Sequence, residues 1–168
     1  MSVAWLYEGW PRVQNRLVYG VPRLTSSQLS LAGVEGWPIW ALVSHIAGTR
    51  VYWLCSVFKE PGLETTPFAD LGDEGWEDHL DQPRGVNDLM KAIDTTWAVV
   101  QSCLDRWTPE MLGESFSRPM PSGLQHHTRA SVLTRMVQHD AFHTGEISLI
   151  LGQNGLPSMD PWEPIPAS

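Results

Sequence analysis

The apolar residues of this chain recur at spacings of three and four in four long segments, and this pattern constrains the fold more than any other feature. The segments cover residues 3–19, 38–58, 87–107 and 128–151. Such spacing places the apolar side chains on one face of a helix, which must be buried against another element. No segment shows the apolar and polar alternation that is typical of a strand. The sequence therefore predicts an all-α fold, an antiparallel four-helix bundle with long crossover connections.

Glycine and proline mark the ends of the predicted helices. Pro38 is expected in a first-turn position of the second helix, where its missing N–H is tolerated. Residues 61–85 are rich in Gly, Pro and Asp and are predicted to be a long surface connection, while residues 109–127 are predicted to be irregular. We expect a single helical domain over residues 1–157 and an extended tail over residues 158–168.

The charge of the chain limits its partners. Its 168 residues include 11 Lys and Arg against 19 Asp and Glu, a net charge of −8 with histidine neutral. Because nucleic-acid affinity comes largely from basic side chains, we predict no nucleic-acid partner. No apolar run approaches the ~18 residues of a membrane-spanning helix, and the first residues do not resemble a signal peptide. We therefore expect a cytoplasmic protein with no membrane partner, in which Cys55 and Cys103 are buried free thiols.

Two histidines in the last predicted helix could share one ion. His139 and His143 are four residues apart, so both imidazoles project from the same helix face about one turn from each other. His45, in the middle of the second predicted helix, could supply a third imidazole. Hydrogen-bonded histidines of a packed core explain the same spacing. Three imidazoles with open coordination positions would describe a catalytic zinc site, and nickel or iron would also accept nitrogen ligands.

Glu146 lies on the same helix face as the two histidines, three residues beyond His143. A carboxylate there could orient a ligand or act as a general base, and an exposed or ion-paired glutamate is the alternative. The other three histidines, His79, His126 and His127, are expected on the surface outside the predicted helices. Glu146 is therefore the candidate catalytic residue.

Three segments of the chain resemble those of one known family. They are residues 40–48 around His45, residues 138–147 with the His-x-x-x-His-x-Gly pattern, and residues 151–155, which read Leu-Gly-Gln-Asn-Gly. Their combined order is similar to that of the DinB/YfiT-like family of metal-dependent enzymes, and the resemblance covers nearly the whole chain. It implies a four-helix bundle with long crossovers, often a homodimer.

The same resemblance implies a divalent metal ion held by His45, His139 and His143. Zinc or nickel is expected, with iron or manganese as alternatives. Members of the family act on small molecules, either as hydrolases through metal-activated water or as S-transferases through a metal-bound low-molecular-weight thiol. The alternative is a non-catalytic, metal-binding, dimeric stress-response bundle, because a fold alone does not determine a reaction.

Overall fold

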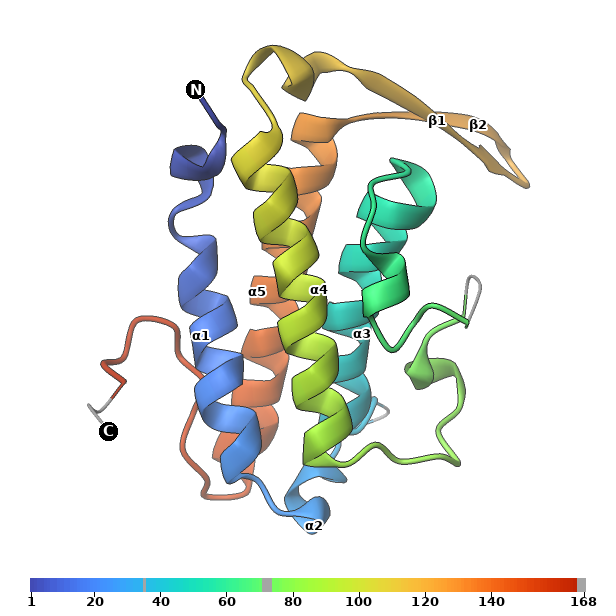
Figure 1. Ribbon diagram of the computed structural model, residues 1–168. Coiled ribbons are helices and arrows are strands. Elements are labelled where there is room, and N and C mark those ends of the chain that lie inside the picture. The colour runs from blue at the N-terminus through green and yellow to red at the C-terminus, as the bar shows by residue number, and fades with distance from the viewer. Residues whose placement is uncertain (35, 71–73, 166–168) are drawn as a thin grey trace.

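The protein is mostly helical, as the sequence predicts. The computed structural model describes residues 1–34, 36–70 and 74–165 (Figure 1). Short 3-10 turns at Ala4–Tyr7, Val21–Arg23, Leu63–Thr65, Trp76–Asp78 and Glu110–Gly113 separate the main elements. The helices and strands are α1 (Trp10–Gly20), α2 (Ser26–Leu29), α3 (Ile39–Val51), α4 (Val86–Arg106), β1 (Ser115–Met120), β2 (Gly123–Thr128) and α5 (Arg129–Gln153).

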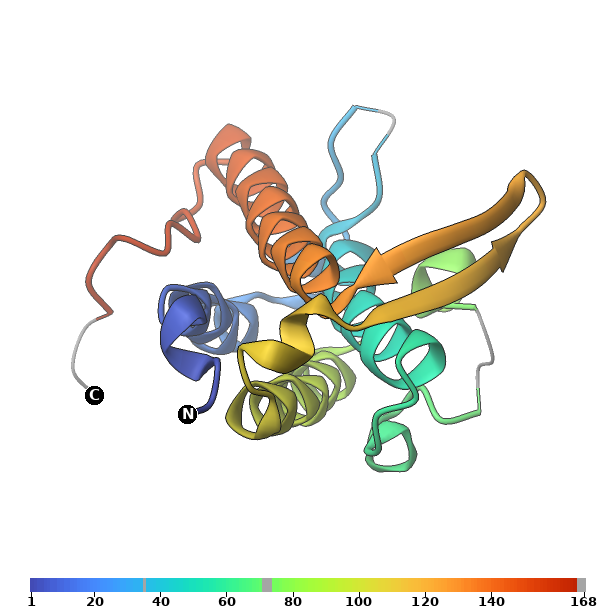
Figure 2. The same ribbon diagram turned by 90° about the horizontal axis from the view of Figure 1, so that it is seen from above.

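The four longer helices lie side by side. In Figure 1, α1 and α5 run downward, whereas α3 and α4 run upward. Since α3 and α4 run in the same direction, the connection over residues 58–85 must return the chain to the end at which α3 began. Figure 2 shows these helices from above, with β1 and β2 projecting away from them. Helix α3 packs against both α4 and α5, so it is the element best placed to carry a site between helices.

Helix α3 occupies the centre of the core. From Ile39 to Ala47 every side chain is buried except that of His45, which is partly exposed. Apolar residues on all sides of a helix indicate burial on all sides. A six-residue π-helical turn, Tyr52–Val57, continues α3. This buried scaffold fixes the direction in which the His45 side chain projects.

Two helices, α1 and α3, begin later in the sequence than predicted, and a proline lies at the start of each. The first long helix begins at Trp10 rather than at residue 3, because Pro11 lacks an N–H and is accommodated only in a first turn. A 3-10 turn, Ala4–Tyr7, precedes it. Pro38 is the N-cap of α3 with extended backbone (φ −65°, ψ 156°), one residue before the predicted position. The other long helices match their predicted ranges to within two residues.

The prediction that the chain contains no strand, and that residues 109–127 are irregular, is wrong. β1 and β2 form an antiparallel hairpin in which Ser115 pairs with Thr128 and Met120 with Gly123. Only β1 alternates between exposed and half-buried residues, and the one turn glycine, Gly123, has φ 120°. Pro119 is tolerated because a two-stranded hairpin consists only of edge strands. Polar β2 residues and this proline hide the strand pattern in the sequence.

The connection over residues 61–85 is more than a surface loop. It buries Phe68 and Trp76, whose rings pack against each other with centroids 5.0 Å apart. The 3-10 turn Trp76–Asp78 lies against α3. The part of this connection that the structure describes therefore belongs to the core and approaches His45.

The remaining segments bear on smaller predictions. Cys55 and Cys103 are buried free thiols, as predicted, and burial raises their pKa values to about 11 and about 12. Met159 anchors the C-terminal tail. Its side chain is buried, and its backbone N–H donates to Ser148 Oγ (2.9 Å). Residues 166–168 of the predicted tail lie outside the described residues. Among the described helices, none has the length and apolar character to cross a membrane.

Candidate metal centre

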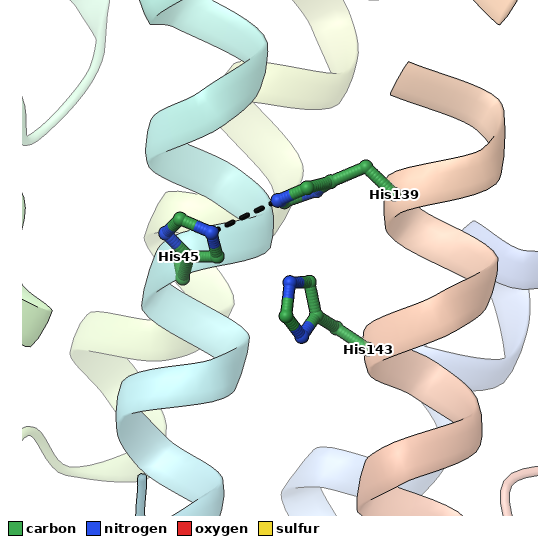
Figure 3. A group of neighbouring side chains, drawn as sticks. All are labelled: His45, His139 and His143. Atoms are coloured by element: carbon green, nitrogen blue, oxygen red, sulfur yellow. Dashed lines mark hydrogen bonds between the residues drawn. The ribbon is translucent and has the colours of Figure 1, made fainter. Parts of the chain in front are cut away.

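The fold brings three histidines from two helices to one point. His45 projects from α3 toward His139 and His143 on α5 (Figure 3). One ring nitrogen from each lies within 4.8 Å of the other two, and Nε2 of His45 is 2.9 Å from Nε2 of His139. The spacing of four on α5 is what places two of these rings one above the other. The predicted juxtaposition of the three histidines is therefore present in the structure.

Two of the histidines are held by carboxylates at Nδ1. Nδ1 of His45 is 2.6 Å from Glu77 Oε1, and Nδ1 of His143 is 3.0 Å from Glu146 Oε2. An ionised carboxylate only accepts hydrogen bonds, so Nδ1 of each ring must carry the proton. In a neutral imidazole this leaves the Nε2 lone pair free. Glu77 and Glu146 thus fix both rings in the tautomer that can bind a metal ion.

The third histidine lies beside a buried ion pair. Nδ1 of His139 is buried without a hydrogen-bond partner, and it lies 3.8 Å from Asp140 Oδ1, which is also buried and unpartnered. The other carboxylate oxygen, Asp140 Oδ2, accepts from Trp10 Nε1 (2.8 Å) and from Arg50 Nε (3.0 Å) and Nη2 (2.8 Å). Asp140 and Arg50 are both fully buried. A carboxylate fixed in this way keeps its free oxygen near His139 Nδ1, at a distance longer than a hydrogen bond.

Burial favours the neutral form of His143. Desolvation lowers the pKa of His143 below 6.5, and the neighbouring His139 and His45 rings add to this effect. The Glu146 carboxylate acts in the opposite direction but does not reverse the shift. Since only a neutral imidazole can bind a metal ion, the surroundings of His143 hold it in the form suited to that role near neutral pH.

Comparison with known proteins places the chain in a family. The sequence model of the DinB superfamily matches residues 10–147, which span α1 to α5 and include all three histidines. The chain belongs to the DinB superfamily. A comparison with curated proteins gave no match.

The fold of a DinB-like protein from Bacillus cereus ATCC 10987 is similar to that of this chain. The two structures agree with a TM-score of 0.63 at 16% sequence identity, over 92% of this chain and 94% of the other. Similarity at this level of identity concerns the fold alone. Together with the family match, it confirms the family resemblance predicted from residues 40–48, 138–147 and 151–155.

The donor set of this DinB-superfamily chain fits a divalent ion. The 2.9 Å contact between Nε2 of His45 and Nε2 of His139 requires one proton between the two rings, and an ion bound by both nitrogens would take the place of that proton. With the proton on Nδ1, facing Asp140, His139 presents a lone pair at Nε2 beside those of His45 and His143. Three convergent imidazole lone pairs match the preference of zinc and nickel for nitrogen ligands.

A cavity of about 260 Å³ opens beside His45, the one histidine of the cluster that lines it, and we term it the metal-side cavity. Its wall along α3 and the π-helical turn includes His45, Thr49, Tyr52 and Ser56, and its floor includes Phe68. Small-molecule sites are typically concave and combine apolar walls with a few polar groups. Space for a small molecule therefore adjoins the cluster at His45, on the side of Glu77.

The other candidate residues have distinct positions. Glu146 is at His143 Nδ1, which is the orienting position considered for it. His79 is exposed and contacts Glu74 (3.1 Å), while His126 and His127 lie on β2 rather than in a loop. Of the described His, Cys, Asp and Glu residues, only His45, His139 and His143 form a group that could hold a metal ion.

Sequence reasoning missed Glu77. Glu77 lies outside the predicted helices, in a connection rich in Gly, Pro and Asp, and it is 32 residues from His45 in the sequence. The only signal was an acidic segment that read as a solvated surface. The role of Arg50 was also missed, because its charge within an apolar helix gains a partner only through Asp140, 90 residues away.

Proposed function

We propose that this protein is a divalent-metal-dependent enzyme that acts on a small molecule in the metal-side cavity. The observation that carries the proposal is the convergence of His45, His139 and His143, with carboxylates beside their Nδ1 atoms. Zinc or nickel suits this nitrogen donor set best, with iron or manganese as alternatives. A divalent ion held there would supply Lewis acidity toward water or a thiol.

Each residue of the site has a specific task in this proposal. Glu77 and Glu146 hold protons on His45 and His143 at Nδ1, which orients the two rings and increases the basicity of Nε2. Asp140, fixed by Arg50, would favour a proton on Nδ1 of His139 through its nearby negative charge, at 3.8 Å. The hydroxyl groups of Thr49 and Tyr52, on the α3 side of the cavity, are placed to orient a substrate.

Of the two reactions, the site gives more support to S-transfer from a low-molecular-weight thiol than to hydrolysis. Glu146, the candidate general base, is engaged by His143 at 3.0 Å, and Glu77 is engaged by His45 at 2.6 Å. In each carboxylate one oxygen is already hydrogen-bonded to a histidine of the cluster, which makes the group less available as a general base for water. In S-transfer the thiol sulfur bonds to an electrophilic carbon of the substrate, the leaving group departs with its electron pair, and the thiol proton passes to solvent.

We also propose the larger organisation. The helices α1, α3, α4 and α5 would form a four-helix bundle with residues 58–85 as a crossover, within one domain over residues 1–157. A homodimer is supported by two exposed apolar side chains on α5, Phe142 (70% exposed) and Leu149 (62%), seven residues apart on one helix face. Size-exclusion chromatography with light scattering tests the dimer, and Phe142→Ser should shift it toward monomer.

Metal analysis of protein purified without a nickel column tests the proposed function. The wild type should bind about one ion per chain after incubation with zinc. His143→Ala should lose that ion, whereas His79→Ala, altered at an exposed histidine, should retain it. Failure of the wild type to bind stoichiometric metal, or undiminished metal in His143→Ala, would contradict the proposal.

A cobalt-substituted protein distinguishes the two reactions. Titration with 2-mercaptoethanol should produce a thiolate charge-transfer band if the site accepts thiols. A cobalt-loaded protein that shows no spectral response to thiols would exclude S-transfer and leave hydrolysis as the reaction of the site.

A further inference from the structure

A second cavity adjoins the metal-side cavity and has the opposite charge. It has a volume of about 430 Å³, and we term it the hairpin cavity because β1 forms one of its walls. Three residues, Tyr52, Ser56 and Arg118, line both cavities, so the two share a wall. The described residues that line the hairpin cavity include two cations and no carboxylate: Tyr52, Ser56, Val57, Lys59, Ser117, Arg118 and Pro119.

Unusual backbone forms the α3 side of the hairpin cavity. Tyr52, Ser56 and Val57 all belong to the π-helical turn that ends α3. Two residues later, Lys59 has φ 60°, the only described residue other than glycine with a positive φ. Such conformations cost free energy and persist where the surrounding structure requires them, which is often at functional sites. Here they turn the chain so that Ser56 and Lys59 line the same cavity.

Arg118 is held in place by aromatic rings rather than by an ion pair. Its guanidinium lies over the rings of Tyr52 (5.0 Å to the centroid) and Trp53 (5.5 Å). Stacking of this kind fixes a planar guanidinium and leaves its N–H groups available in the plane. Within the described part of the chain, no carboxylate forms an ion pair with Arg118. A fixed guanidinium with available donors is suited to bind a carboxylate through two parallel hydrogen bonds.

The acidic residues of the metal-side cavity lie at the other end and have partners. Glu77 contacts His45, Asp78 accepts from the Gly75 N–H (2.8 Å), and Glu74 contacts His79. The combined space is therefore divided, with His45 and the acidic residues at one end and Lys59 and Arg118 at the other. Seven residues of helix separate His45 from Tyr52, a rise of about 10 Å.

We propose that the hairpin cavity binds a carboxylate group of the small molecule whose other end reaches the histidine cluster. Arg118 binds the carboxylate, and the Ser56 hydroxyl and Lys59, whose ammonium also donates to the Ser56 carbonyl (2.6 Å), complete its surroundings. The substrate class is thus an organic carboxylate with its reactive end about 10 Å from the carboxylate. The inference about the reactive end rests on the proposed function, whereas the carboxylate site itself does not.

Two matched thiols test this assignment. The carboxylate 8-mercaptooctanoate and the neutral alcohol 8-mercaptooctanol differ only at the end that would enter the hairpin cavity. Titration calorimetry on zinc-loaded wild type should show that the carboxylate binds about tenfold more tightly than the alcohol. One hydrogen bond to a charged group increases binding affinity by about this factor. Arg118→Gln should abolish the preference, and Arg12→Gln, which alters an exposed arginine stacked on Trp162, should retain it.

Lys59→Gln serves as a second test in case Arg118→Gln disturbs the folding of the hairpin. Lys59 is exposed and outside the hairpin, so this variant should fold and show a reduced preference for the carboxylate. Equal binding of the two thiols by the wild type, or a preference unchanged in both Arg118→Gln and Lys59→Gln, would overturn the proposal.

Metal-free protein separates this proposal from the proposed function. There the carboxylate preference should persist while both thiols bind more weakly. A preference for the carboxylate in a protein that binds no zinc would support the carboxylate site and refute the metal-dependent function. Stoichiometric zinc without any carboxylate preference would do the reverse.

Discussion

The Glu77 carboxylate lies 2.6 Å from Nδ1 of His45, although the two residues belong to different elements and are 32 residues apart. Glu77 stands in the 3-10 turn Trp76–Asp78, which the buried ring of Trp76 anchors to the core. The connection before α4 therefore helps to build the site rather than simply covering it.

Glu77→Gln should weaken metal binding. An amide replaces the carboxylate that holds the Nδ1 proton of His45, and loss of such a partner typically costs about 10- to 100-fold in metal affinity. Competition with a chromogenic chelator measures the affinity. Glu74→Gln, at a neighbouring carboxylate that contacts only His79 among the described residues, serves as the control. Equal affinities of Glu77→Gln and wild type would show that Glu77 does not act through His45.

Asp140→Asn should invert the tautomer of His139. Three N–H groups of Trp10 and Arg50 converge on Asp140 Oδ2, so the amide oxygen would occupy that place and the NH2 would face His139 Nδ1. His139 would then accept at Nδ1 and carry its proton on Nε2. Metal affinity should fall by about tenfold or more.

Nitrogen-15 NMR of the histidine rings in metal-free protein reads this tautomer directly. The wild type should show the His139 proton on Nδ1, and Asp105→Asn, at an exposed aspartate, should leave it there. A wild-type proton found on Nε2 would rule out the orienting role of Asp140, even if the variant failed to fold.

His127 should titrate below its ordinary pKa. Burial lowers the pKa of His127 from 6.5, and the charges of Arg135, Arg118 and His126 lower it further. Because the unfolded state then binds more protons, the contribution of His127 to stability rises with pH between its folded pKa and 6.5. Arg118→Gln should raise this pKa, as an NMR titration would show, whereas Arg12→Gln should not change it. An unchanged value in Arg118→Gln would mean that the two side chains do not interact.

Arg129→Met should destabilise the fold by about 1.5–3 kcal/mol, because the nearly buried Glu60 carboxylate loses one charged hydrogen-bond donor and keeps those of Arg106 and Trp107. Urea unfolding measures the loss. Arg106→Gln removes the exposed arginine of the same cluster, 48% exposed, and should cost less than about 1 kcal/mol. Similar losses in the two variants would contradict this assignment of the buried pair.

The same cluster should make stability depend on acid pH. Burial raises the pKa of Glu60. Hydrogen bonds from Arg106, Arg129 and Trp107 lower it by more, so the pKa of the folded state lies below 4.5. The contribution of Glu60 is therefore present above 4.5 and is lost as the pH falls through the lower folded pKa. Glu60→Gln should flatten the dependence of unfolding free energy on pH in this window. A pH profile identical to that of the wild type would argue against the cluster.

The histidine pair illustrates what helical periodicity can predict. The spacing between His139 and His143 sets their common direction as soon as the segment is helical, since side chains four residues apart lie on one face. His45 followed from the family resemblance and from its place in an apolar helix. The hairpin escaped prediction because the polar residues of β2 and Pro119 of β1 break the alternation on which strand prediction depends.

The sequence by itself determined the long helices, the family and the three histidines, because helical periodicity and a motif are properties of local order along the chain. The tertiary structure alone decided which groups surround them: Glu77 at His45, Asp140 between Arg50 and His139, and Arg118 stacked over Tyr52 at the far end of the cavities. Glu77 is 32 positions from His45, and Asp140 is 90 positions from Arg50. Glu77 and Arg118 lie in segments without a helical period, and the pairing of Arg50 with Asp140 depends on how α3 packs against α5. Local order places the histidines, and long-range packing supplies the carboxylates and the guanidinium beside them.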